Sequence, residues 1–316
     1  MVAPTVEEVR GYALDLGWDD VGFTTPEIPA EDLASWRDWI GKGLHGPALH
    51  YMESKLRESP LALFPRAKTA IIFISNYKQP KVAEAATPER MLVASYSRGR
   101  DYHQLHRSRC KQLIRWLEEK VGEREIALPF SDSKPLMEKC LAVRAGLGWF
   151  GKNSLLIHRR YGTFVLIAGV LTSLEFPTAP PLSTREARCG SCQRCLDACP
   201  TQALYAPYQI DARRCLSYHL IESKEAIPQE IAVANPGYLF GCDICQDVCP
   251  HNVRSPLSQE EAFAPSRFGG PWVDETQLAQ WEEEPSLLFG SPLKRAGTQR
   301  LRQTFSLWQS EKGKRG

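Results

Sequence analysis

The amino-acid sequence predicts a protein of the α+β class, with a mixed α/β domain in residues 1–178, a cysteine-rich module in 179–255 and a short C-terminal tail in 256–316. Three observations lead to this prediction. Apolar, β-branched runs alternate with helical patterns in the first half of the chain, a Pro-rich segment follows at 174–187, and eight of the ten cysteines fall between residues 189 and 249. A length of 316 residues suits one large domain with a smaller one.

The first domain is predicted from its periodic patterns. Thr5 and Glu8 form a capping-box pattern for a helix that ends near Gly17. The runs "TAIIFISNY" (69–77) and "GTFVLIAGVLT" (162–172) are typical of buried strands. Apolar residues at helical spacing predict helices over 103–121 and roughly 135–146, the second of them begun by a proline that follows Asp132.

Composition excludes several classes of protein. The chain has 43% hydrophobic and 24% charged residues, which is ordinary for a globular protein, and a net charge of +2 is too small to indicate a nucleic-acid binder by itself. The longest apolar run, 164–171, has the length of a strand, and the N-terminus has no secretory signal pattern. We therefore expect a cytoplasmic protein, in which ten cysteines favour metal binding or redox chemistry over disulfides.

The cysteine-rich module carries the strongest signal in the chain. "CGSCQRCLDACP" has the spacing Cys-x2-Cys-x2-Cys-x3-Cys-Pro, and "CDICQDVCP" repeats the end of that pattern. Two zinc sites would also use eight cysteines, but the tight first triple favours iron–sulfur cubanes, because bacterial ferredoxins have this spacing and their fourth cysteine ligates the other cluster. We expect one 4Fe–4S cluster on Cys189, Cys192, Cys195 and Cys249 and another on Cys199, Cys215, Cys242 and Cys245. Pro200 and Pro250, which follow a cysteine in each group, can each begin a helix.

Two cysteines stand outside this ferredoxin-like pattern. Cys110 and Cys140 both lie in stretches with helical spacing of apolar residues, so we interpret them as small buried hydrophobic side chains.

The upstream domain contains weaker signals. "AGLGWFGKN" holds three glycines, Gly146, Gly148 and Gly151, which suits close approach of the backbone to a ligand or an ordinary turn. Its spacing does not match the dinucleotide-binding pattern. Asp132 could be an ordinary N-cap.

Together with the cysteines, several stretches resemble the epoxyqueuosine reductase family: "LFPRAKTAIIFISNY", "SRGRDYH", "DSKPLMEK", "RAGLGWFGKNSLLI", "RRCLSYHLIE" and "FGSPLKRAG". The resemblance covers most of residues 50–300. The family, which is related to the reductive dehalogenases, carries a cobalamin and two 4Fe–4S clusters and converts epoxyqueuosine to queuosine at the wobble position of tRNA. The resemblance therefore implies a tRNA-modifying oxidoreductase with a cobalamin-binding first domain.

The resemblance also implies roles for individual residues. Asp132 would donate a proton to the opening epoxide oxygen, which requires a pKa raised by burial beside the corrin. Cobalamin contacts are implied for Arg57, Arg98, Asp132, Lys152, Asn153, Ser154, Ser217 and Asp243. We interpret His103 and His106 as helix-surface or structural residues, so that no histidine of the chain would ligate cobalt from below. Lys134 stands where many members have a small residue.

The implied partners are a tRNA carrying epoxyqueuosine in its anticodon loop and an external electron donor, for a monomer with no membrane contact. Many members continue into a helical-repeat extension, whereas this sequence ends at residue 316, so tRNA contacts made there would be absent or replaced. Cations concentrate in the C-terminal basic segment, at Lys294, Arg295, Arg300, Arg302, Lys312, Lys314 and Arg315, and again at Arg98, Arg100, Arg107 and Arg109. Both groups could bind phosphates or form solvated faces.

Two other functions fit parts of this pattern. One is another corrinoid iron–sulfur reductase of the dehalogenase type, although that class usually carries a twin-arginine signal. The other is a ferredoxin-type electron carrier whose upstream domain serves for docking. Cobalamin content separates the carrier from both enzymes, because a carrier should contain none.

Overall fold

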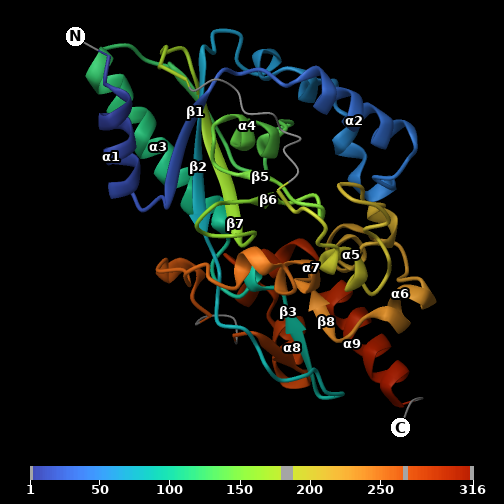
Figure 1. Cartoon of the computed structure of the whole chain (residues 1–316). Helices are drawn as coiled ribbons and strands as arrows, with labels where there is room; N and C mark the ends of the chain where they lie inside the picture. The colour runs from blue at the N-terminus through green and yellow to red at the C-terminus, as the bar shows by residue number, and fades with distance from the viewer. Residues whose placement is uncertain (1–2, 179–187, 266–269, 314–316) are drawn as a thin grey trace. The chain divides into compact units, whose positions relative to one another are not determined.

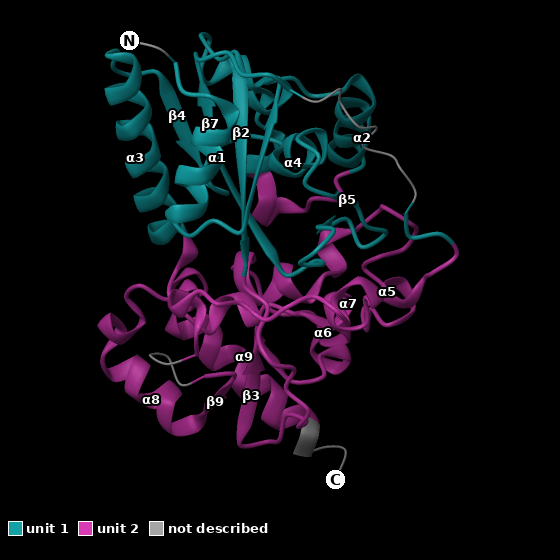
Figure 2. Cartoon of the chain, turned by 60° about the vertical axis from the view of Figure 1, so that its left-hand side comes forward, with its two compact units in different colours: residues 1–42, 51–76, 103–190 teal, residues 43–50, 77–102, 191–316 magenta. Residues whose placement is uncertain are grey.

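A computed structural model of the chain describes residues 3–178, 188–265 and 270–313. The chain divides into two compact units, which are coloured separately in Figure 2. Unit 1 comprises residues 1–42, 51–76 and 103–190, and unit 2 comprises residues 43–50, 77–102 and 191–316. Each unit is therefore assembled from three separate stretches of the sequence.

Unit 1 is built on a four-stranded antiparallel sheet in the order β1-β2-β7-β4. Figure 1 labels β1, β2 and β7, and Figure 2 labels β4. The strands are β1 (Asp20–Thr24), β2 (Thr69–Asn76), β7 (Val165–Thr172) and β4 (Ala127–Phe130). The strands predicted at 69–77 and 162–172 are confirmed as β2 and β7. These two are the central strands, which explains why their sequences are almost continuously apolar.

Helices cover both faces of this sheet, so unit 1 has three layers. On one face Ile71, Phe73 and Val170 pack against Val9 of α1 (Val6–Asp15) and Leu113 of α3 (Tyr102–Val121). On the other face Ile72, Ile74 and Leu171 pack against Leu141 and Val143 of α4 (Glu138–Arg144). Because neighbouring residues of a strand point to opposite faces, β2 can contribute to both cores at once.

The helices of unit 1 agree with the sequence except at one boundary. The Thr5–Glu8 capping box begins α1, and the helix predicted at 103–121 is α3, so both predictions are confirmed. The prediction that Pro135 begins α4 is wrong, because the helix begins at Glu138. Pro135 lies in a turn in which the Leu136 N–H donates to the Lys134 carbonyl at 2.8 Å. A proline disfavours helical geometry in the residue before it, which leaves Lys134 outside the helix.

Unit 2 has a smaller mixed sheet in the order β8-β3-β9. β3 (Arg90–Val93) pairs parallel with β8 (Tyr238–Phe240) and antiparallel with β9 (Trp272–Asp274). Met91 and Val93 are buried among Trp281 of α8 (Glu275–Glu283) and Phe305 of α9 (Thr298–Gly313). The predicted C-terminal tail is thus part of a hydrophobic core.

The remaining elements are short. Unit 1 also contains α2 (Ala30–Gly41) and a hairpin of β5 (Trp149–Phe150) and β6 (Leu156–Ile157), and unit 2 contains α5 (Arg194–Asp197), α6 (Gln229–Ala234) and α7 (Ile244–Asp247). A π-helix spans Tyr218–Glu222. The 3-10 helices are Pro47–Glu53, Lys55–Glu58, Pro60–Ala62, Ser95–Ser97, Ala212–Arg214, Pro250–Asn252, Glu261–Phe263, Pro285–Leu288 and Pro292–Arg295.

The sequence predicted domain boundaries after residues 178 and 255, and the two observed units do not follow these boundaries. Residues 77–102 pack with unit 2, because β3 pairs only with strands that come much later in the chain. Of the predicted Pro-rich linker 174–187, residues 179–187 lie outside the described residues. In the described part of the chain, no helix has the length and apolarity needed to cross a membrane.

Candidate active site and cluster-binding cysteines

Asp132 lies in unit 1, two residues after β4 ends at Phe130. Its backbone has a φ of 54°, which is the left-handed region, and its N–H donates to Oε1 of Glu138 at 2.7 Å. Asp132 is not an N-cap, because Met137 precedes the first residue of α4. Its side chain is 69% exposed within the described structure, so the protein atoms alone do not supply the burial that a proton donor was expected to need.

Glu138 is a residue that the sequence analysis missed. Burial of its carboxyl group, followed by the nearby charge of Asp132, raises the pKa of Glu138 well above its ordinary value, although Arg57 acts in the opposite direction. The Arg57 guanidinium is buried and donates from Nη1 to the Leu136 carbonyl at 2.9 Å. In sequence Glu138 looks like any acid near a helix start, so no local pattern could have singled it out.

The two histidines of α3 differ in their surroundings. Nε2 of His103 lies 3.9 Å from Oδ2 of Asp132, and the side chain is 29% exposed. His106 is fully buried, and its two ring nitrogens lie 2.8 Å from Oγ of Ser131 and 3.2 Å from Oγ of Ser75. His106 therefore links β2 to the residue that follows β4, as expected of a structural histidine, whereas His103 is next to the predicted proton donor.

The glycine-rich stretch packs closely against its own chain. A Cβ on Gly148 would lie 2.3 Å from the Ile157 carbonyl oxygen, and one on Gly151 would lie 2.5 Å from Oδ1 of Asn153. Gly146, with a φ of 78°, ends the turn after α4. At Gly148 and Gly151 the close approach is thus to the β5–β6 hairpin rather than to open space.

The predicted cofactor contacts after Gly151 are mostly buried. Lys152 donates to the Gly190 carbonyl at 2.7 Å, and Oδ1 of Asn153 accepts the Leu155 N–H at 3.3 Å. Ser154 has a φ of 62°, and its carbonyl accepts from Nζ of Lys139 at 2.7 Å. Among the described residues, Oγ of Ser154 and Nε of Arg57 are buried without a hydrogen-bond partner. Such atoms suit a polar ligand, because an unpaired buried polar group is costly.

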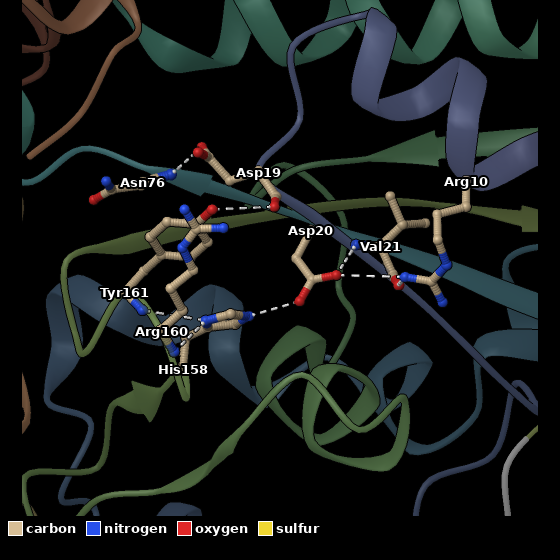
Figure 3. A network of polar contacts seen from close by, with 8 residues as sticks. All are labelled: Arg10, Asp19, Asp20, Val21, Asn76, His158, Arg160 and Tyr161. Atoms are coloured by element: carbon tan, nitrogen blue, oxygen red, sulfur yellow. Dashed lines mark hydrogen bonds and ion pairs between the residues drawn. The ribbon is translucent and has the colours of Figure 1, made fainter. Parts of the chain in front are cut away.

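A polar network fixes the end of the β5–β6 hairpin to β1 (Figure 3). Nε2 of His158 lies 3.0 Å from Oδ2 of Asp20, and the hydroxyl of Tyr161 donates to the Asp19 carbonyl at 3.3 Å. Burial alone would raise the pKa of Asp20, but hydrogen bonds from His158 and the Val21 N–H lower it overall. The segment that follows Ser154 is therefore held against the sheet by charge-assisted bonds.

Three of the eight predicted cofactor contacts belong to unit 2: Arg98, Ser217 and Asp243. Arg98 is buried and donates from Nε to the Val93 carbonyl at 3.0 Å. A carboxylate oxygen of Asp243 accepts the Ser95 N–H at 2.6 Å, and burial raises the pKa of Asp243. Ser217 precedes the π-helix and lies within hydrogen-bonding reach of Cys215. The other five predicted contacts belong to unit 1.

The cysteines of the second predicted cluster lie near one another in unit 2. Burial is the main cause that raises the pKa of Cys215, Cys242 and Cys245, and neighbouring thiols add to it. The pKa of Cys242 is raised by the nearby thiols of Cys215 and Cys199. The pKa of Cys245 is raised by those of Cys242, Cys215 and Cys195. In the described part of the chain, no group of three or more histidine, cysteine, aspartate or glutamate side chains is arranged to hold a metal ion.

The prolines and the isolated cysteines can also be placed. Pro250 begins the 3-10 helix Pro250–Asn252, as predicted, whereas Pro200 lies in a turn after α5, so that prediction is wrong. Cys110 and Cys140 are buried, in agreement with their interpretation as small hydrophobic residues. Burial raises the pKa of Cys110 to about 12, which makes it unreactive at neutral pH.

Several cations of the C-terminal basic segment bind their own chain. Arg295 makes two hydrogen bonds of 2.8 Å to Glu222, and Arg302 pairs with Glu275 and Glu282. Of the rest, Arg300 is 4% exposed, and Nζ of Lys294 lies 4.2 Å from the ring centroid of Phe289. Lys314 and Arg315 lie outside the described residues. The second group is also divided, since Arg98 and Arg109 are buried while Arg100 and Arg107 are exposed.

Two segments of the chain match known protein families. Residues 188–252 match the 4Fe-4S double cluster binding domain, so the cysteine module is an iron–sulfur domain for two clusters rather than a pair of zinc sites. Residues 57–133, which include Arg57 and Asp132, match the family described as epoxyqueuosine reductase QueG.

The particular family follows from whole-chain similarity. The chain is 36% identical over 308 residues to the epoxyqueuosine reductase of Pseudomonas aeruginosa, covering 94% of this chain and 83% of that one. It is similar, at 28% identity and a TM-score of 0.83, to the crystal structure of an epoxyqueuosine reductase with an epoxyqueuosine-modified tRNA-Tyr stem loop, covering 96% and 80% of the two chains. It is also similar to the Bacillus subtilis enzyme, solved with its aspartate catalytic loop swung out of the active site, at 27% identity and a TM-score of 0.80, with coverage of 96% and 80%. This chain belongs to the epoxyqueuosine reductase family.

Proposed function

We propose that this chain reduces epoxyqueuosine to queuosine in the anticodon loop of tRNA. The observation that carries the proposal is the 36% identity over 308 residues to an epoxyqueuosine reductase, within which both Asp132 and the cysteine module are present. The reaction removes the epoxide oxygen as water and consumes two electrons and two protons. The chain must therefore bring together an electron supply, a proton donor and a loop nucleotide.

The electron supply is assigned to two 4Fe–4S clusters. One would be held by Cys189, Cys192, Cys195 and Cys249, and the other by Cys199, Cys215, Cys242 and Cys245. The proximity of Cys199, Cys215, Cys242 and Cys245 in unit 2 supports the second set. Each cluster carries one electron at a time, so the chain also needs an external donor and a two-electron centre.

Cobalamin is the cofactor proposed for that centre, and when bound in its reduced form it would supply the electron pair to the substrate. Arg57, Lys152, Asn153 and Ser154 of unit 1, and Arg98, Ser217 and Asp243 of unit 2, are the residues proposed to hold it. The buried Nε of Arg57 and Oγ of Ser154, which have no partner among the described residues, fit a ligand with many polar groups. Burial lowers the pKa of Arg57 and of Arg98. The ordinary pKa of arginine is so high that both side chains nevertheless stay charged.

Asp132 is the proposed proton donor. Its position after an edge strand leaves the carboxyl group exposed to a substrate, and Nε2 of His103 lies 3.9 Å from its Oδ2. The carboxyl proton goes to the epoxide oxygen as the C–O bond breaks, so that the leaving oxygen is not expelled as a free alkoxide.

The tRNA is bound through a loop whose bases are not paired. Such bases can be turned outward and stacked in a pocket without opening a duplex. We propose that the enzyme acts on tRNA in the cytoplasm and does so as a monomer.

The test uses the full chain loaded with cobalamin and both clusters, a chemical electron donor and an epoxyqueuosine-modified stem loop. Nucleoside mass analysis should show queuosine formation, and Asp132→Asn should lower turnover by about a hundredfold or more. Asp15→Asn, an exposed change at the end of α1, is the matched control and should be fully active. Absence of queuosine with the loaded wild type would reject the function, and a fully active Asp132→Asn variant would reject the catalytic assignment.

A further inference from the structure

The loop that carries Asp132 is bound by the side chain of Glu138. Glu138, the first residue of α4, reaches back six positions and accepts the Asp132 N–H at 2.7 Å. The donor of this bond is the backbone N–H of the proposed proton donor itself, and the acceptor is a carboxyl oxygen. A distance of 2.7 Å lies at the short end of the range for N–H···O hydrogen bonds.

A second contact holds the same loop on its other side. Arg57 donates to the Leu136 carbonyl at 2.9 Å, and both residues are buried. The charge of Arg57 also acts on Glu138, so the two anchors stabilise each other. Between these anchors, residues 133–135 are partly or fully exposed.

The backbone of Asp132 needs such an anchor. A φ of 54° is uncommon for a residue with a side chain, and aspartate adopts it at a cost that surrounding bonds must offset. Without the bond to Glu138, the loop can relax toward ordinary backbone angles and carry the carboxyl group away. The Bacillus subtilis relative was solved with its aspartate catalytic loop swung out of the active site, so that protein's loop has more than one position.

We propose that Glu138 is a positioning residue that keeps the Asp132 loop in the conformation seen in this structure through the Asp132 N–H bond. The inference rests on the proposed role of Asp132 as proton donor. Glu138 does not touch the substrate in this scheme. It sets the fraction of molecules in which Asp132 is placed to react, and hence kcat rather than KM.

The variants are chosen to separate the bond from the charge. Glu138→Ala removes the acceptor, whereas Glu138→Gln keeps an acceptor oxygen at the same reach and resembles the protonated acid, which the raised pKa of Glu138 favours. Glu138→Asp keeps the carboxyl group but shortens it by one methylene, and it serves if the Ala variant does not fold. Glu7→Ala, in the exposed first turn of α1, is the matched control.

Two measurements test the proposal on the full loaded chain. Amide hydrogen exchange should become about ten- to a hundredfold faster at Asp132 in Glu138→Ala, the range expected when a backbone donor loses its acceptor. Single-turnover kinetics with the modified stem loop should show kcat lowered by a similar factor and KM changed less than about threefold. Glu138→Gln should restore both values to within about threefold, Glu138→Asp should shift both in the direction of the Ala variant, and Glu7→Ala should match the wild type.

Three results would overturn the inference. They are unchanged exchange at Asp132 in Glu138→Ala, a loss of kcat in Glu138→Gln as large as in Glu138→Ala, and a rise in KM that accounts for the whole effect. Asp132→Asn separates this failure from that of the proposed function. If Asp132→Asn is inactive while every Glu138 variant is normal, only the positioning role fails, whereas a fully active Asp132→Asn removes the premise itself.

Discussion

Replacement of Arg300 by methionine should destabilise unit 2 without acting directly on tRNA. Arg300 is 4% exposed, and its Nη2 donates to the Ser223 carbonyl at 2.8 Å and also to the Glu225 carbonyl. Methionine fills a similar volume but donates nothing, so two backbone acceptors lose a charged partner. Hydrogen bonds to charged groups contribute about 1.5–3 kcal/mol each, and shared geometry makes them less than additive, so we expect a loss of about 2–4 kcal/mol in the free energy of unfolding.

The assay is thermal unfolding combined with tRNA binding at several salt concentrations. A loss of that size lowers Tm by roughly 4–16 °C for a unit of this length. Arg295→Met is the control, because its two bonds to Glu222 lie at an exposed site and should contribute less than about 1 kcal/mol. Well below Tm, Arg300→Met should bind the stem loop with the salt dependence of the wild type.

The opposite pattern would refute this reasoning. An unchanged Tm together with a smaller salt slope of binding would mean that Arg300 contacts a phosphate and is not held by its own chain. The same comparison bears on neutralising Lys294, Arg295, Arg300 and Arg302 together. We expect the structural loss at Arg300 to dominate that variant, so weakened tRNA binding by it could not be assigned to phosphate contacts.

Three further outcomes are expected. Cys199→Ala should leave about four of eight irons and spare the cluster of its sequence neighbours, measured as iron and acid-labile sulfide, whereas loss of all iron would contradict the ligand sets. Gly169→Ala should cost about 1–3 kcal/mol in a urea unfolding curve, because its Cβ would lie 2.3 Å from the Phe130 ring and 2.6 Å from the Ile71 carbonyl oxygen. An unchanged midpoint would contradict this steric argument. Because the pKa of Asp20 is lowered in the folded state, its contribution to stability is present above the unfolded pKa of about 3.9 and is lost as pH falls through the folded value. Asp20→Asn should therefore flatten the fall in unfolding free energy below about pH 4, and identical pH profiles would exclude this role.

The sequence predicted elements whose signals are local. The Thr5–Glu8 capping box and the central strands β2 and β7 could be identified because capping chemistry and continuous apolar runs depend on neighbouring residues. The start of α4 was misplaced because Pro135 suits both a helix start and a turn, and only the bond between Leu136 and Lys134 decides between them.

The surroundings of the candidate site depended on distant contacts that no local pattern encodes. Asp132 was singled out by family resemblance, but its bond to Glu138 requires a left-handed backbone that the sequence does not specify. Likewise the C-terminal cations looked like a basic patch in sequence. Arg302 is in fact paired with Glu275 and Glu282, which precede the C-terminal basic segment in the sequence.

The pairing of β3 determines how late in synthesis the sheet of unit 2 can form. β3 cannot complete its sheet until β8 and then β9 have been synthesised, and the roughly 180 intervening residues take about 10–40 s at ordinary elongation rates. During that interval the apolar side chains of Met91 and Val93 have no native core to enter. Cys242 lies two residues after β8 ends at Phe240, so its thiol is also positioned only when this sheet closes. We therefore expect iron–sulfur cluster insertion to be a late step that follows closure of this sheet.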